Sequence, residues 1–174
     1  YAKWKRPATF ERNLVVIGAG AAGLVASYIA ATVKAKVTLV EARKMGGDCL
    51  NYGCVPSKAL IKTATLARQI RHSQDYGIAA ATASIDFAQV MERVAGVVRA
   101  VEPHDSIERY TALGVDVVTG HARLVNPWTV EIRRDDGSTQ TLTTRSIVIA
   151  TGAAPFVPPL PGLGDVGYLT SDTL

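Results

Sequence analysis

The sequence predicts an α/β fold built around a parallel sheet, and three features of the first part of the chain support that prediction. Residues 13–18 form a short apolar, β-branched run that ends in glycine, which is typical of a buried parallel strand. Residues 21–33 are rich in alanine and indicate a helix, and residues 36–41 return to the pattern of a strand. A strand, a helix and a second strand in this order form a βαβ unit with a right-handed crossover.

The middle of the chain predicts a pair of long helices. Helices are expected over residues 56–74 and 87–113, and Pro103 is expected to kink or interrupt the second, because a proline inside a helix removes a backbone hydrogen bond. Two such helices joined by a loop suggest a long antiparallel pair. The apolar positions at helical spacing are Leu60, Ala64, Ala67 and Ile70 in the first helix, and Val90, Val94, Val97, Val98 and Val101 in the second.

The last third of the chain predicts strands again. Residues 115–119 are expected to form a strand, and residues 128–133 and 140–144 are expected to form a small β-meander around Asp136-Gly137, a strong hairpin-turn signal. Residues 146–150 form another apolar run and predict one more buried strand.

Composition and charge limit the classes of protein to consider. The 174 residues fit one domain with or without an appendage, and 48% hydrophobic residues suffice for a packed core. Most of the net charge of +4 lies in residues 1–12, which predicts a basic leader or linker before a domain over residues 13–174. We expect no nucleic-acid partner, since no basic stripe interleaved with aromatic residues is present. The sequence shows neither a signal peptide nor a long apolar run, so we expect a cytoplasmic location.

A glycine-rich motif links the first strand to the first helix and predicts a dinucleotide site. Gly18 permits the tight turn, Gly20 lets the backbone approach a pyrophosphate, and Gly23 lets the helix pack closely on the strand. Glu41 ends the second strand, where its carboxylate can accept hydrogen bonds from a ribose diol. The predicted nucleotide-binding residues here are Gly18, Ala19, Gly20, Ala21, Ala22, Gly23, Glu41 and Ala42.

Cys49 and Cys54, which are separated by four residues, predict a redox-active disulfide. Such a short loop makes a weak structural crosslink, worth roughly 2 kcal/mol. Cys54 lies just before a predicted helix, whose N-terminus favours a thiolate. The alternatives are a structural disulfide and a metal site, but the latter needs further ligands, and the histidines are scattered at His72, His104 and His121. We therefore expect no metal.

These motifs occur in an order that resembles a known family. The glycine motif, Glu41, the segment Gly46-Gly47-x-Cys49-x4-Cys54-x-Pro56-Ser57-Lys58 and the tripeptide Ala150-Thr151-Gly152 resemble the N-terminal FAD domain of the class I pyridine nucleotide-disulfide oxidoreductases. That family includes dihydrolipoamide dehydrogenase, glutathione reductase and mercuric reductase. The resemblance covers residues 13–174 and implies a Rossmann-like FAD-binding domain that stops before the NAD(P) domain.

The resemblance implies a function and a role for each matching residue. Electrons pass from NAD(P)H to FAD, then to the disulfide, then to a small-molecule disulfide or a metal ion, in an enzyme that forms a homodimer. Cys49 would attack the substrate, and Cys54 would form the charge-transfer contact with the flavin. The other implied FAD contacts are Gly47, Asp48, Lys58, His121, Ala122, Ala150, Thr151 and Gly152. The family also needs its NAD(P) and dimerisation domains, so the chain alone is expected to be inactive.

Two positions depart from the usual motif of the family. Asp48 stands where threonine is more usual and Tyr52 where valine is more usual, and an acid beside Cys49 is expected to raise the pKa of that thiol. Ser57-Lys58 resembles the lipoamide and mercuric reductase branch, including a bacterial subgroup in which some members carry the reductase behind a membrane domain. The basic leader would suit that junction. The alternative function is a FAD-fold binding or redox-sensing module without turnover of its own.

Overall fold

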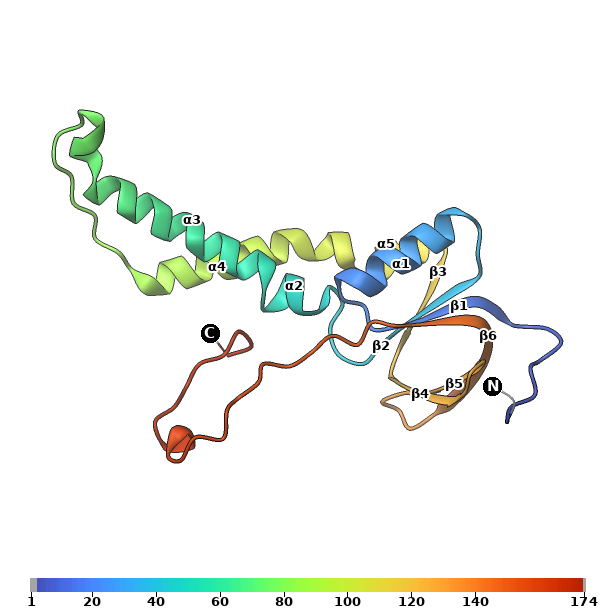
Figure 1. Cartoon of the computed structure of the whole chain (residues 1–174). Helices are drawn as coiled ribbons and strands as arrows, with labels where there is room; N and C mark the ends of the chain where they lie inside the picture. The colour runs from blue at the N-terminus through green and yellow to red at the C-terminus, as the bar shows by residue number, and fades with distance from the viewer. Residues whose placement is uncertain (1–2, 174) are drawn as a thin grey trace.

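The computed structural model describes residues 3–173 and is organised around a six-stranded mixed sheet (Figure 1). The strand order is β3-β2-β1-β6-β5-β4, parallel from β3 to β6 and antiparallel from β6 to β4. The predicted parallel sheet and βαβ unit are confirmed. The strands are β1 (Arg12–Ile17), β2 (Val37–Glu41), β3 (Val115–Thr119), β4 (His121–Asn126), β5 (Thr129–Arg133) and β6 (Thr139–Ile149).

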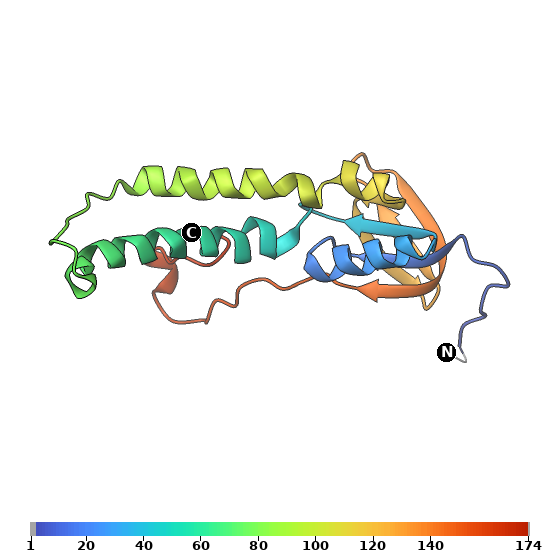
Figure 2. The same cartoon turned by 90° about the horizontal axis from the view of Figure 1, so that it is seen from above.

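The helices form two groups, one on the sheet and one that projects from it (Figures 1 and 2). Helices α1 and α5 pack on the sheet, whereas α3 and α4 lie side by side and extend away from it, as the predicted antiparallel pair. The helices are α1 (Ala21–Thr32), α2 (Gly47–Asn51), α3 (Cys54–Arg71), α4 (Phe87–Val101) and α5 (Ile107–Ala112), with short 3-10 turns η1 (Ser73–Tyr76), η2 (Glu102–Asp105) and η3 (Leu163–Asp165).

The parallel strands are buried on both faces because neighbouring residues of one strand point in opposite directions. Val16 and Leu39 face α1 and α5, in a cluster that includes Tyr110 of α5. Val15 and Val40 face the other way, against the antiparallel strands, in a cluster that includes Ile132 of β5. The parallel strands therefore lie between a helical layer and a β layer.

The structure differs from the predicted elements in three places. Strand β6 is one continuous strand, so the two separate strands predicted at 140–144 and 146–150 are wrong: its first half pairs with β5 and its second half with β1. Strand β4 (His121–Asn126) was not predicted. Helix α3 begins at Cys54 rather than at Pro56, because a proline in the first turn needs no backbone donor.

Other local predictions are confirmed. The helix predicted over 87–113 is interrupted near Pro103, where α4 gives way to η2 and α5. The Asp136-Gly137 turn connects β5 to β6, and the Asp136 carboxylate accepts a hydrogen bond from the Ser138 backbone N–H at 2.8 Å.

The leader meets the sheet earlier than the predicted domain boundary. Strand β1 begins at Arg12, and the Glu11 carboxylate accepts a hydrogen bond from the backbone N–H of Thr143 in β6 at 2.8 Å. The division into a leader over 1–12 and a domain over 13–174 stays a prediction. Within residues 3–173, no helix combines the length and the apolar character needed to cross a membrane.

Candidate functional site

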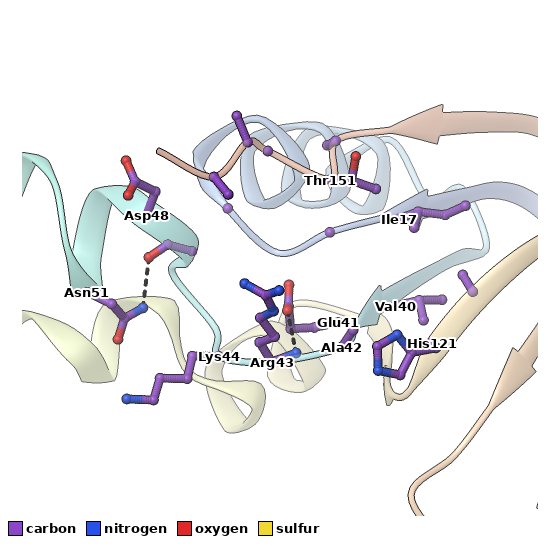
Figure 3. Close-up of a pocket in the computed structure, with 18 of the residues that line it drawn as sticks. Ile17, Val40, Glu41, Ala42, Arg43, Lys44, Asp48, Asn51, His121 and Thr151 are labelled. Carbon is purple, nitrogen blue, oxygen red and sulfur yellow. Dashed lines mark hydrogen bonds between the residues drawn. The ribbon is translucent and has the colours of Figure 1, made fainter. Parts of the chain in front are cut away.

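A cavity of ≈ 480 Å³ lies at the carboxyl ends of the parallel strands (Figure 3). This is the edge at which open α/β sheets bind their ligands, because the connecting loops diverge there and leave a crevice. The turns after β1, β2, β3 and β6 all contribute to its wall, and so does the segment that carries the cysteines.

The glycine turn has the shape that the motif predicts. A Cβ at Gly23 would lie 1.7 Å from the Gly18 carbonyl oxygen, so only glycine lets α1 pack this closely on β1. Gly18 has φ +102, and a Cβ there would lie 2.2 Å from the carbonyl oxygen of Ala150, which follows β6. Beside Gly20 there is more space, since the nearest atom to an added Cβ would be the Gly47 Cα at 3.8 Å. Gly20 therefore leaves room in the cavity, while Gly18 and Gly23 hold the turn in place.

The N-terminus of helix α1 faces this cavity without a side-chain cap or an acid in its own first turn. Gly20 is its N-cap residue and offers no side-chain hydrogen bond, and the first turn contains no acidic residue. The first backbone N–H groups of a helix have no partner within the helix, and the helix dipole adds partial positive charge there. The turn thus fits a phosphate group.

The Glu41 carboxylate is held in place by two backbone groups. Its Oε2 accepts a hydrogen bond from the Ala19 N–H at 2.6 Å, and its Oε1 accepts one from the Arg43 N–H at 2.7 Å. An ionised carboxylate has about four acceptor sites, so capacity remains on the oxygens for a ligand. Glu41 thus connects the glycine turn to the loop after β2, and its remaining acceptor sites suit the hydroxyl groups of a ligand.

Hydrogen bonds within the cysteine segment fix its conformation. The Asn51 side-chain amide donates to the carbonyl oxygens of Met45 at 3.0 Å and Gly47 at 2.8 Å. The carbonyl oxygen of Asp48 accepts hydrogen bonds from the backbone N–H groups of Tyr52 and Gly53. A Cβ at Gly47 would lie 2.6 Å from the Gly20 Cα, so this segment packs directly against the glycine turn.

The two cysteines meet at the junction of α2 and α3. Cys49 is half-buried in α2, and Cys54 is exposed as the first residue of α3; both are free thiols. The pKa of Cys49 is raised above the ordinary thiol value, mainly by its hydrogen bond with the Cys54 side chain and also by burial, while the charge of Lys58 acts in the opposite direction. Asp48, the expected source of a raised pKa, is not among these causes.

The cavity brings together most of the predicted cofactor residues. Those that line it are Gly18, Gly20, Glu41, Ala42, Gly47, Asp48, His121, Ala122, Ala150, Thr151 and Gly152. The predicted residues outside its lining are Ala19, Ala21, Ala22, Gly23, Cys49, Cys54 and Lys58. Their assigned contacts with a cofactor stay predictions.

Sequence reasoning missed part of the wall. The additional lining residues are Ile17, Val40, Arg43, Lys44, Asn51, Tyr52, Gly120, Ala153, Ala154 and Asp172. Arg43 and Lys44 could have been found, because they follow Glu41 directly in the same loop. Asp172 lies far along the chain from every motif, so no sequence spacing indicates it. Among residues 3–173, no group of three or more His, Cys, Asp or Glu side chains could hold a metal ion.

The fold and the site together define an α/β domain with a cavity at the carboxyl ends of its parallel strands and an adjacent pair of thiols. Residues 12–173 match the family model described as pyridine nucleotide-disulphide oxidoreductase. The chain therefore belongs to this family, which confirms the resemblance found in the sequence.

Two relatives and one solved structure illustrate the similarity. Over 84% of this chain, the sequence is 42% identical to a dihydrolipoyl dehydrogenase of Geobacillus stearothermophilus. Over 92% of this chain, it is 34% identical to a mercuric reductase of Staphylococcus aureus. It covers only 31% and 28% of those proteins, respectively. The solved structure is that of RclA, the HOCl-induced flavoprotein disulfide reductase from Escherichia coli, as the Cu(II) complex of a cysteine-to-serine mutant. It superposes on this chain with a TM-score of 0.72 and 25% sequence identity, and the match covers 90% of this chain and 32% of that one.

Proposed function

We propose that this chain is the FAD-binding part of an NAD(P)H-dependent disulfide reductase in which Cys49 and Cys54 alternate between dithiol and disulfide. The observation that supports this most strongly is the contact between the two thiols on a segment that also walls the nucleotide cavity. Cys49 and Cys54 do not line the cavity themselves, but Asp48, Asn51 and Tyr52 of the same segment do, so the thiol pair would lie next to a flavin bound there.

Each part of the cavity suits one part of FAD. The N-terminus of α1 would hold the pyrophosphate, Glu41 the adenosine ribose, and the backbone at His121-Ala122 the adenine. The small residues Ala150, Thr151 and Gly152, which follow β6, let the chain pass close to the cofactor. When bound, FAD would supply two-electron chemistry next to the cysteines.

The cysteines would carry the electrons onward. Opening the disulfide takes up two electrons and two protons to give two thiols, and closing it returns both. Cys54 is the exposed first residue of the 18-residue helix α3, so its sulfur is open to exchange with Cys49 and with a bound cofactor. Cys49, with its raised pKa, would keep its proton near neutral pH and lose it on attacking the substrate.

The acceptor and the assembly are also proposals. The names of the relatives, mercuric reductase and dihydrolipoyl dehydrogenase, point to a metal ion or a small disulfide as the substrate class. This chain spans less than a third of those relatives. NAD(P)H binding and homodimer contacts would then lie in parts of the protein outside this chain, and turnover would require them.

Two spectroscopic measurements test the proposal. The purified protein should be yellow and should release FAD on denaturation, and reduction of the FAD-loaded protein should give a long-wavelength charge-transfer band. Cys54→Ser should abolish the band, whereas the matched variant Cys49→Ser should keep it. A protein that binds no FAD when FAD is added, or a band that survives in Cys54→Ser, would contradict the proposal.

A further inference from the structure

Arg43 lies in the nucleotide cavity and its guanidinium has no partner within residues 3–173. Its backbone N–H is fixed by the Glu41 carboxylate at 2.7 Å, and its side chain lines the cavity. Figure 3 shows this side chain pointing from the loop after β2 across the cavity, beside Glu41. The neighbouring Lys44 points elsewhere, with its Nζ over the Tyr52 ring at 6.0 Å from the centroid. Of these two adjacent cations, Arg43 is thus the one whose charge is free to meet a ligand.

The opposite wall of the cavity is also positive. It is formed by the glycine turn and the N-terminus of α1, which has neither a side-chain cap nor an acid in its first turn. The Glu41 carboxylate, which accepts from the Ala19 and Arg43 backbone N–H groups, offsets part of this positive charge, but the first N–H groups of α1 and the Arg43 guanidinium remain as donors for an anion. A dinucleotide places its diphosphate at this helix end.

The acidic residues of the lining indicate that a bound anion needs Arg43. The cavity lining contains three carboxylates, from Glu41, Asp48 and Asp172, and two cations, from Arg43 and Lys44. Carboxylates are acceptors only and cannot donate a hydrogen bond to phosphate oxygens. A bound diphosphate adds more negative charge, so it needs a cation near it.

We propose that Arg43 binds the diphosphate of the nucleotide from the side opposite to α1 and so determines the affinity for ADP-containing ligands. This inference rests on the proposed function and adds a binding residue to the same site. A guanidinium suits the role because its planar donors match two phosphate oxygens at once. The Glu41 carboxylate holds the backbone N–H of Arg43 and would also bind the ribose. The ribose and the diphosphate would then be bound by two nearby residues of one loop.

The test compares ligands with and without phosphate. Apoprotein is titrated calorimetrically with ADP, adenosine and FAD, as wild type, Arg43→Gln and the matched control Arg71→Gln, which removes an exposed charge in the last turn of α3. Arg43→Gln should weaken ADP and FAD about tenfold or more and leave adenosine unchanged, since a hydrogen bond between charged groups is worth about 1.5–3 kcal/mol. Arg43→Lys keeps the positive charge but cannot donate to two phosphate oxygens in parallel, so it should give an intermediate loss of affinity for ADP and FAD.

Each other outcome has one meaning. If Arg43→Gln binds ADP as tightly as Arg71→Gln does, Arg43 has no role in phosphate binding. If adenosine weakens as much as ADP, Arg43 contacts the nucleoside and the phosphate assignment is wrong. A wild-type protein that binds neither ADP nor FAD would instead overturn the proposed function itself.

Discussion

The two ends of the parallel sheet use polar groups in opposite ways. At the amino end, Arg12 in β1 donates to the Thr38 hydroxyl in β2 at 2.7 Å and to the Asp116 carboxylate in β3 at 2.9 Å, and Thr38 donates to Asp116 at 3.0 Å. At the carboxyl end, the helix α1 N–H groups and the Arg43 guanidinium face a cavity without such partners among residues 3–173. The same strands therefore end in a closed network on one side and in unpaired groups on the other.

This difference separates stability from binding within one small sheet. Polar groups that satisfy each other hold three strands together and leave little for a ligand. Polar groups held in place by backbone hydrogen bonds, as Glu41 is, keep capacity for a ligand without having to rearrange. Substitutions at the two ends should accordingly change different measurements.

The largest effect is expected at the carboxyl end, from Gly23→Ala. The new Cβ would lie 1.7 Å from the Gly18 carbonyl oxygen, and no side-chain rotation can relieve a clash with backbone. The glycine turn must open, which should cost about 3 kcal/mol of unfolding free energy and lower the Tm by about 6–12 °C. FAD binding should fall with it, and thermal unfolding together with FAD titration measures both.

The matched control for this substitution is Gly96→Ala in α4. An added Cβ there would meet nothing closer than the Arg99 Nη2 at 3.8 Å. Alanine is more favourable than glycine in the interior of a helix, so this variant should gain about 0.5–1 kcal/mol of unfolding free energy. A Gly23→Ala protein as stable as Gly96→Ala would show that the glycine turn has more freedom than the structure indicates.

The next effect compares the ends directly, through Arg12→Met and Glu41→Gln. Arg12→Met removes the donor that joins β1 to β2 and β3, and because the Arg12–Asp116 pair is partly solvent-exposed, the loss should be only about 1 kcal/mol with FAD affinity unchanged. Glu41→Gln keeps one acceptor oxygen of the two and should weaken FAD binding about tenfold or more. FAD titration should separate the two variants, since only Glu41→Gln is expected to lower the affinity, and urea unfolding measures the loss of stability in Arg12→Met.

A single outcome would remove the distinction. If Arg12→Met weakens FAD binding as much as Glu41→Gln does, the amino-end network shapes the cavity, and the two ends are not independent.

The carboxyl end was also the part that the sequence predicted best. The turn after β1 needs glycines for steric reasons that are local, so Gly18, Gly20 and Gly23 are recognisable from spacing alone. Strand β6 was harder to predict as one strand, because residues 139–146 are polar on average. Thr144 is nevertheless fully buried, and its hydroxyl donates to the Ser146 carbonyl oxygen at 2.8 Å. The orientation of Arg43 depends on its hydrogen bond with Glu41 and on the course of the loop, which a sequence pattern does not contain.

The smallest effect concerns the proton on Cys49. Because its pKa is raised, first by the hydrogen bond with Cys54 and then by burial, alkylation of Cys49 should require a higher pH than that of an ordinary thiol. Cys54→Ala should lower the midpoint of the alkylation rate against pH, whereas Lys58→Met should raise it, since the Lys58 charge favours the Cys49 thiolate. A raised thiol pKa also contributes stability that is present below the ordinary value of 9.0 and is lost as the pH rises through the raised pKa. Mass spectrometry of Cys49 labelled with iodoacetamide over a range of pH measures the midpoint for each variant. If the midpoints of Cys54→Ala and Lys58→Met shift in the same direction, Cys54 and Lys58 do not set the pKa of Cys49 in opposite directions.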